Sequence, residues 1–141
     1  MLRARGGSGM SYAGAVALQA ALYEHLSGQP ALAGVPIHDA VPRGSGRGTW
    51  ILIGPEEVRD ASDGSGRGAR HDFTVSVMSD AAGFLAAKRV ALALSDALVT
   101  APPVLDRGRL VRLDFLKAVA RRLGSGDARR IDLTFRARIE E

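Results

Sequence analysis

The stretch Ile131-Asp132-Leu133-Thr134-Phe135-Arg136-Ala137-Arg138-Ile139-Glu140 alternates apolar and polar side chains without interruption. Successive side chains of a β-strand point to opposite faces of a sheet, so one face of this segment is apolar and the other is polar. Antiparallel sheets commonly bury one face and leave the other in water. The stretch therefore predicts a half-buried strand with one wet face.

The preceding segment, Arg109–Leu123, fits two structures. Helical spacing joins Leu113, Leu116, Ala120 and Leu123, and the content of Ala, Leu, Lys and Arg favours a helix. A strand is indicated by Val111, Leu113, Phe115 and Val119, although Lys117 breaks the alternation. If the segment is a strand, Gly124–Asp127 forms a hairpin turn to the last strand. The pattern alone leaves both structures open.

Two further strands are predicted upstream. Thr49–Val58 has the apolar centre Trp50-Ile51-Leu52-Ile53, and its Gly54-Pro55 pair indicates a bend or bulge. His71–Ser79 alternates well. The two strands form a hairpin with a long mobile loop at Asp60–Arg70, and Val35–Asp39 is a short strand whose Pro36 suits only its start or a sheet edge.

Two helices complete the pattern. The first spans Ser11–Ser27, capped by Ser11 and ended by Gly28 and Pro30. The second spans Asp80–Val99, capped by Asp80 and followed by Pro102-Pro103. The stripe expected to pack in the first helix is Val16, Ala20, Tyr23 and Ser27, with Leu22 and Leu26 beside it. The stripe expected in the second is Phe84, Ala87, Ala91, Leu94 and Leu98, flanked by Val90 and Ala97.

This order predicts an α+β fold, a mainly antiparallel β-sheet with two amphipathic helices packed on one face. A length of 141 residues fits one domain, expected at 11–141. Residues 1–10 are expected to be a disordered or upstream tail, because arginines precede no apolar signal region there. No apolar stretch approaches the roughly 20 residues of a membrane span, so no membrane partner is expected.

The composition limits the possible chemistry. The chain has no cysteine, which excludes disulfides and thiolate metal sites. Its formal charge of +4 raises the case for an anionic partner only modestly. The basic residues are dispersed, and all except Lys88 and Lys117 are arginine. A solvated basic surface explains this pattern better than a nucleic-acid site.

No motif predicts catalysis, a metal or a cofactor. The pentapeptide Gly-Ser-Gly-Arg-Gly occurs at 44–48 and 64–68, but each copy leads into a strand and lacks the Lys-Ser/Thr pair of a phosphate loop. His38-Asp39 and His71-Asp72 are adjacent pairs whose side chains point to opposite faces, which favours surface residues at strand ends. Trp50 is expected to be a core anchor and Glu56-Glu57 a solvated pair.

The two glycine-rich loops are instead expected to order on contact with a protein partner, through side chains that pair with its charged groups. The candidate interface residues are Arg43, Arg47, Asp60, Asp63, Arg67 and Arg70.

Several segments recur in an order known from one family. They include Val35-Pro36-Ile37-His38-Asp39-Ala40-Val41-Pro42, Trp50-Ile51-Leu52-Ile53-Gly54, His71-Asp72-Phe73-Thr74-Val75-Ser76-Val77 and Leu94-Ser95-Asp96-Ala97-Leu98. In order and spacing, from about Tyr12 to Glu140, the chain resembles the tail-completion, or tail-terminator, proteins of long-tailed phages and of phage-derived gene transfer agents, in particular the alphaproteobacterial version. None of these segments is diagnostic alone.

The resemblance implies a structural protein and no enzyme. It implies a ring of six subunits that ends the tail tube and joins it to the head-side connector, with DNA passing through the lumen without specific binding. It implies assembly in the cytoplasm and a final place in the neck or tail of a phage-like particle. It also implies that Arg109–Leu123 is a strand. The alternatives are another connector component such as a stopper, usually more barrel-like, or a small basic nucleic-acid-binding module.

Overall fold

The computed structural model describes residues 12–45, 47–64, 66–124 and 128–141. The expected tail at 1–10, the expected cap Ser11 and most of the turn expected at Gly124–Asp127 lie outside these ranges. The helices and strands are α2 (Ala13–Ser27), β2 (Ile37–His38), β3 (Thr49–Asp60), β4 (Gly68–Ser79), α3 (Leu85–Val99), β5 (Arg109–Arg122) and β6 (Arg129–Glu140). Short 3₁₀ turns occupy Pro30–Leu32 and Arg43–Ser45. The order α-β-β-β-α-β-β matches the prediction.

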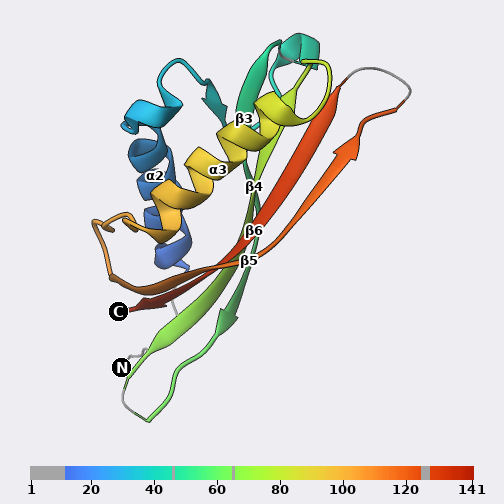
Figure 1. The fold of residues 1–141 in the computed structure, drawn as a ribbon. Coiled ribbons are helices and arrows are strands. Elements are labelled where there is room, and N and C mark those ends of the chain that lie inside the picture. Colours follow the sequence, from blue (N-terminus) through green and yellow to red (C-terminus); the bar gives the residue numbers. More distant parts are fainter. Residues whose placement is uncertain (1–11, 46, 65, 125–127) are drawn as a thin grey trace.

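The strands form one five-stranded sheet in the order β2-β3-β4-β6-β5. The short β2 runs parallel to β3, and every other neighbouring pair is antiparallel. Figure 1 shows α2 and α3 on the same side of this sheet, with α2 nearer the β2–β3 edge and β5 at the opposite edge. The predicted α+β class is confirmed.

β5 is a strand. The family resemblance implies this structure, whereas the helix propensity of the segment favours a helix. β5 pairs with β6 from Arg109 opposite Glu140 to Arg122 opposite Arg129. The register shifts between Phe115 and Lys117, where the sequence alternation breaks. Pairing with a strand that already has a buried face outweighs the intrinsic preference of Ala, Leu, Lys and Arg for helix.

The β3–β4 hairpin is longer than predicted. β3 continues to Asp60 and β4 begins at Gly68, so the expected loop Asp60–Arg70 is wrong at both ends. The sequence hides these strand ends because their side chains are polar or absent, whereas pairing of Gly68 with Glu140 of β6 extends the sheet. The expected irregularity at Gly54-Pro55 is confirmed, since the register shifts between Ile53 and Glu56 and the Gly54–Pro55 peptide is cis.

α2 packs with a different face from the one predicted. Val16 and Tyr23 are 67% and 53% exposed, whereas Leu18, Leu22 and Leu26 are buried. Both faces of α2 are apolar, so periodicity could not choose between them. The leucines at i, i+4 and i+8 form the bulkier stripe, and burying them removes more apolar surface from water.

α3 buries the predicted stripe, namely Ala87, Ala91, Leu94 and Leu98, with Ala97 beside it. Its predicted start at Asp80 is wrong, because the helix begins at Leu85. Asp80 instead closes the end of the hairpin. Its carboxylate accepts a hydrogen bond from the Gly48 N–H at 3.0 Å, and its own N–H donates to the Gly48 carbonyl at 3.1 Å.

The core lies between the helices and one face of the sheet. The apolar faces of β4 and β6 meet there, and the Phe73 and Phe135 rings stack with centroids 5.5 Å apart. Phe115 of β5 contacts the Phe135 ring edge-on at 5.8 Å. α3 covers this centre and α2 covers the β3 side, so neither helix covers the opposite face of the sheet (Figure 1).

Candidate functional site

The six predicted interface residues do not form one site. Arg43 and Arg47 lie before β3, whereas Asp60, Asp63, Arg67 and Arg70 lie where β3 turns into β4. The 12 residues of β3 separate the two groups, a length of roughly 35–40 Å at the usual rise per residue. Figure 1 shows them at opposite ends of the molecule. The structure therefore offers two separate surfaces.

The turn at the tip of the β3–β4 hairpin is held by its own polar groups. The Asp60 carboxylate accepts hydrogen bonds from the Ser62 hydroxyl at 2.7 Å and the Ser62 N–H at 3.1 Å, and these bonds lower the pKa of Asp60. Asp63 and Gly66 exchange backbone hydrogen bonds. The Arg138 guanidinium donates to the Ala61 carbonyl at 2.8 Å, which ties the turn to β6.

The remaining predicted residues differ in their surroundings. The Arg43, Arg47 and Arg67 side chains are exposed. The Arg70 side chain lies on the open face of the sheet, with its Nε 3.9 Å from an oxygen of Asp72. Arg70, and also Asp63, whose carboxylate oxygen lies 3.6 Å from a guanidinium nitrogen of Arg138, thus join a larger group of charges.

That larger group covers the face of the sheet away from the helices. The Asp72 carboxylate on β4 accepts two hydrogen bonds from the Arg136 guanidinium on β6, at 2.9 and 3.1 Å. The hydrogen bond from Arg136 is the main cause that lowers the pKa of Asp72 and raises that of Arg136. The pair bridges two neighbouring strands, so it ties the centre of the sheet together.

A second charged group lies further along the same face. Asp132 of β6 accepts hydrogen bonds from the Ser76 hydroxyl at 2.5 Å and from the Arg130 Nε at 2.7 Å, and Arg121 of β5 lies 3.6 Å away. Burial acts to raise the pKa of Asp132, but these donors outweigh it and the pKa is lowered. The sequence identified this face as wet, and only the strand register shows which charges meet.

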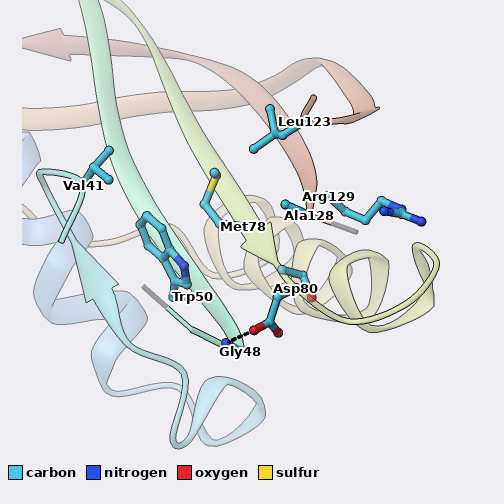
Figure 2. Close-up of a pocket in the computed structure, with 9 residues that line it drawn as sticks. Val41, Gly48, Trp50, Met78, Asp80, Leu123, Ala128 and Arg129 are labelled. Atoms are coloured by element: carbon cyan, nitrogen blue, oxygen red, sulfur yellow. Dashed lines mark hydrogen bonds between the residues drawn. The ribbon is translucent and has the colours of Figure 1, made fainter. Parts of the chain in front are cut away.

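A small apolar site interrupts the polar face near the end of the sheet. Figure 2 shows Trp50 beside Met78 and Val41, with Leu123 and Ala128 across from them, and these residues line a cavity of about 280 Å³. Trp50 is 4% exposed, and the His38 ring contacts it edge-on with centroids 5.5 Å apart. Trp50 is a buried anchor as predicted, although it lies on the face opposite the main core.

The three histidines lie apart from one another, and each contacts a different part of the protein. His71 is fully buried, with its Nδ1 3.0 Å from an oxygen of Glu56, so the expectation of a surface residue is wrong for His71. Its neighbour Asp72 points to the opposite face, as alternation requires. Among the described residues, His, Asp and Glu form no group of three or more that could hold a metal ion. Glu56 is partly engaged by His71 and is not the simple solvated residue expected.

Among the residues that the structure describes, no helix is both long enough and apolar enough to cross a membrane.

Comparison with known proteins identifies the family. The family model described as tail completion protein gp17 matches residues 20–140. A solved chain from a structure titled "Virion of native gene transfer agent (GTA) particle" is 57% identical, with a TM-score of 0.83, and the match covers 93% of this chain and 100% of that one. The search of curated proteins found no match. The fold, the order of its segments and the family match agree with the resemblance seen in the sequence: the chain belongs to the tail completion protein gp17 family and is a structural tail-completion protein.

Proposed function

We propose that the chain forms a ring that ends the tail tube of a phage-like particle and joins the tube to the head-side connector. The ring contains six copies, as the family resemblance implies. Its partners are other copies of the chain, the tail tube protein and the connector or stopper protein. The chain assembles in the cytoplasm and then occupies the neck or tail of the particle.

One observation carries this proposal. The 57% identity and the TM-score of 0.83 extend over the whole of a chain taken from an intact gene transfer agent particle. The proposal therefore assigns this chain the same kind of place, in a gene transfer agent particle.

The charges of the open face support a role that leaves DNA free to pass. Arg130 and Arg136 are bound to Asp132 and Asp72, and Arg112 lies 2.7 Å from Asp114. A phosphate that bound these arginines would have to displace a carboxylate that already accepts their hydrogen bonds. We propose that DNA crosses the lumen without specific binding, because tight contacts with many phosphates would slow its transit.

Two alternatives make different predictions. A stopper would occupy the connector side of the neck, and the long helix α3 disfavours the more barrel-like stopper fold. A basic nucleic-acid-binding module would bind DNA with an affinity that falls steeply with salt. Gel-shift titration of the purified chain at low and moderate salt checks the second alternative, and strong, salt-sensitive binding would favour it.

Cryo-electron microscopy of intact particles from cells that make the protein tests the proposal. We expect a closed ring of this chain between the last ring of the tail tube and the connector. A position on the connector side only would favour a stopper. Absence of the chain from purified particles would refute a structural role in the particle.

A further inference from the structure

The surface of α2 that faces solvent is unusually apolar. Tyr12, Val16 and Tyr23 are 69%, 67% and 53% exposed. In Ala13–Ser27 the only acidic side chain is Glu24 and the only basic one is His25. A helix with one face in water normally carries charged and polar side chains on that face, whereas a helix that is apolar all round is normally buried. The outer face of α2 thus has the composition of a covered surface.

A groove runs between this face of α2 and the β2–β3 edge of the sheet. Two hollows of about 400 and 720 Å³ share the lining residues Gln19 and Ala20 and so form one continuous depression. Acidic side chains stand at both ends of it, with Glu56 at one end and Glu24 and Asp39 at the other. We call this depression the edge groove and define it by Tyr12, Val16, Ala20, Tyr23, Asp39 and Glu56.

A surface of complementary character lies on β5. This strand forms the opposite edge of the sheet, and from Phe115 to Arg122 every residue is exposed. Phe115, Leu116 and Val119 are between 42% and 47% exposed. The ionisable residues of β5 are one acid, Asp114, and the bases Arg109, Arg112, Lys117, Arg121 and Arg122. A long apolar edge strand is a template for association unless another chain covers it.

The two surfaces lie at opposite edges of one sheet (Figure 1). Both are apolar, and their charges have opposite sign. A contact between two different patches of the same chain leaves one patch of each kind free on every pair, so further copies add until the series closes on itself. Charge complementarity fixes the orientation of such a contact and disfavours pairing of like surfaces.

We propose that the edge groove of one copy binds the exposed half of β5, Phe115–Arg122, of a second copy. This inference rests on the proposed function, because it names the surfaces through which the ring would close. Leu116 and Val119 contact the apolar wall that α2 provides. Lys117, Arg121 and Arg122 approach the acidic ends of the groove.

Chemical cross-linking tests the contact, and the absence of native cysteine makes it specific. One variant carries Val16→Cys on α2 and another carries Leu116→Cys on β5. Particles are prepared from cells that make either variant or both together, treated with a short bis-maleimide and analysed on a denaturing gel. The same treatment is applied to the purified chains at high concentration. Leu92→Cys, which is also exposed but lies on α3, replaces Val16→Cys in a matched control.

We expect a cross-linked dimer when the two variants are present together and none with either variant alone or with the control pair. A chain that carries both cysteines should give a ladder that stops at six copies. Dimers from Val16→Cys alone would show a two-fold contact and overturn the proposal. Chains present in particles but without any dimer would overturn the contact and leave the ring proposal intact. If particles lack the chain, the proposed function is refuted. The cross-linking of the purified chains then tests the proposed contact independently.

Discussion

Asp72 on β4 and Arg136 on β6 form a two-pronged ion pair, with Nε and Nη2 of Arg136 donating to the two carboxylate oxygens at 2.9 and 3.1 Å. The side chains lie directly across two neighbouring strands in the centre of the sheet. Asp72 retains little solvent contact, with 22% of its side chain exposed. The stability of the sheet therefore depends on whether the Asp72 carboxylate is charged.

Replacement of this carboxylate should weaken the fold modestly. Asp72→Asn keeps the shape but loses the charge, and we expect a fall of about 1 kcal/mol in the free energy of unfolding at neutral pH, in the range of partly exposed ion pairs. Urea denaturation followed by circular dichroism measures this change. Glu57→Gln is a matched control, because Glu57 pairs with Arg59 on an exposed part of β3 and should change stability little.

The same groups set the response to acid. The pKa values of Asp72 and Asp132 are lowered in the folded protein, so their stabilising contribution is complete above the unfolded carboxyl pKa of about 4 and is lost as the pH falls through the lower folded values. We expect the free energy of unfolding to decline below roughly pH 4 and Asp72→Asn to flatten that decline. Urea titrations at a series of pH values check this, and an unchanged acid slope in the variant would contradict it.

Shortening a side chain should reduce the stability of the protein strongly on the buried face of α2 and very little on its exposed face. Leu22 is 1% exposed in the core, and Leu22→Ala should cost about 3 kcal/mol through lost burial and the cavity left behind. Val16 on the same helix is 67% exposed, and Val16→Ala should leave stability within about 0.5 kcal/mol of the original or raise it slightly, since Ala favours helix. Thermal and urea unfolding at low protein concentration compare the two. A large loss for Val16→Ala would mean that this face packs within the monomer.

The single tryptophan should report unfolding from the face opposite the main core. Trp50 is 4% exposed, so its fluorescence should be blue-shifted in the folded chain and shift red on denaturation. Trp50→Ala should cost about 3–5 kcal/mol, the usual range for a buried aromatic side chain. Met78→Ala, which shortens a neighbour seen in Figure 2, should shift the emission towards the red while the chain stays folded. An emission maximum typical of water in the native state would contradict the buried position.

Substitution of two glycines by alanine distinguishes the cost of backbone strain from the cost of a steric clash. Gly108 and Gly83 both have φ of 75°, a conformation that costs other residues about 1–2 kcal/mol. A Cβ at Gly108 would lie 3.1 Å from the Glu140 carbonyl oxygen, whereas one at Gly83 would meet no described atom within 4 Å. Gly108→Ala should therefore destabilise more than Gly83→Ala, which should cost about 1 kcal/mol. Equal losses in the free energy of unfolding, measured by urea denaturation, would show that the backbone near Gly108 and Glu140 moves to accommodate the added Cβ.

The sequence determined those parts of the fold in which a segment carries its own period. Ile131–Glu140 and Asp72–Val77 alternate at every residue, and the α3 stripe repeats at helical spacing, so each predicted its element and buried face. The family was also readable there, in the order and spacing of whole segments. Local chemistry likewise located the irregularity at Gly54-Pro55.

Only the tertiary structure decided the features that depend on a partner segment. Arg109–Leu123 fitted helix and strand equally until β6 supplied backbone partners, and α2 offered two apolar faces until the sheet took the leucines. The sequence did not say how far apart the two candidate interface loops, near Arg43 and near Arg70, lie in space, and β3 holds them at opposite ends. The spacing of apolar residues within a segment depends on that segment alone. Strand pairing and burial instead depend on free energies shared between segments that are distant in the chain, so no local pattern reveals them.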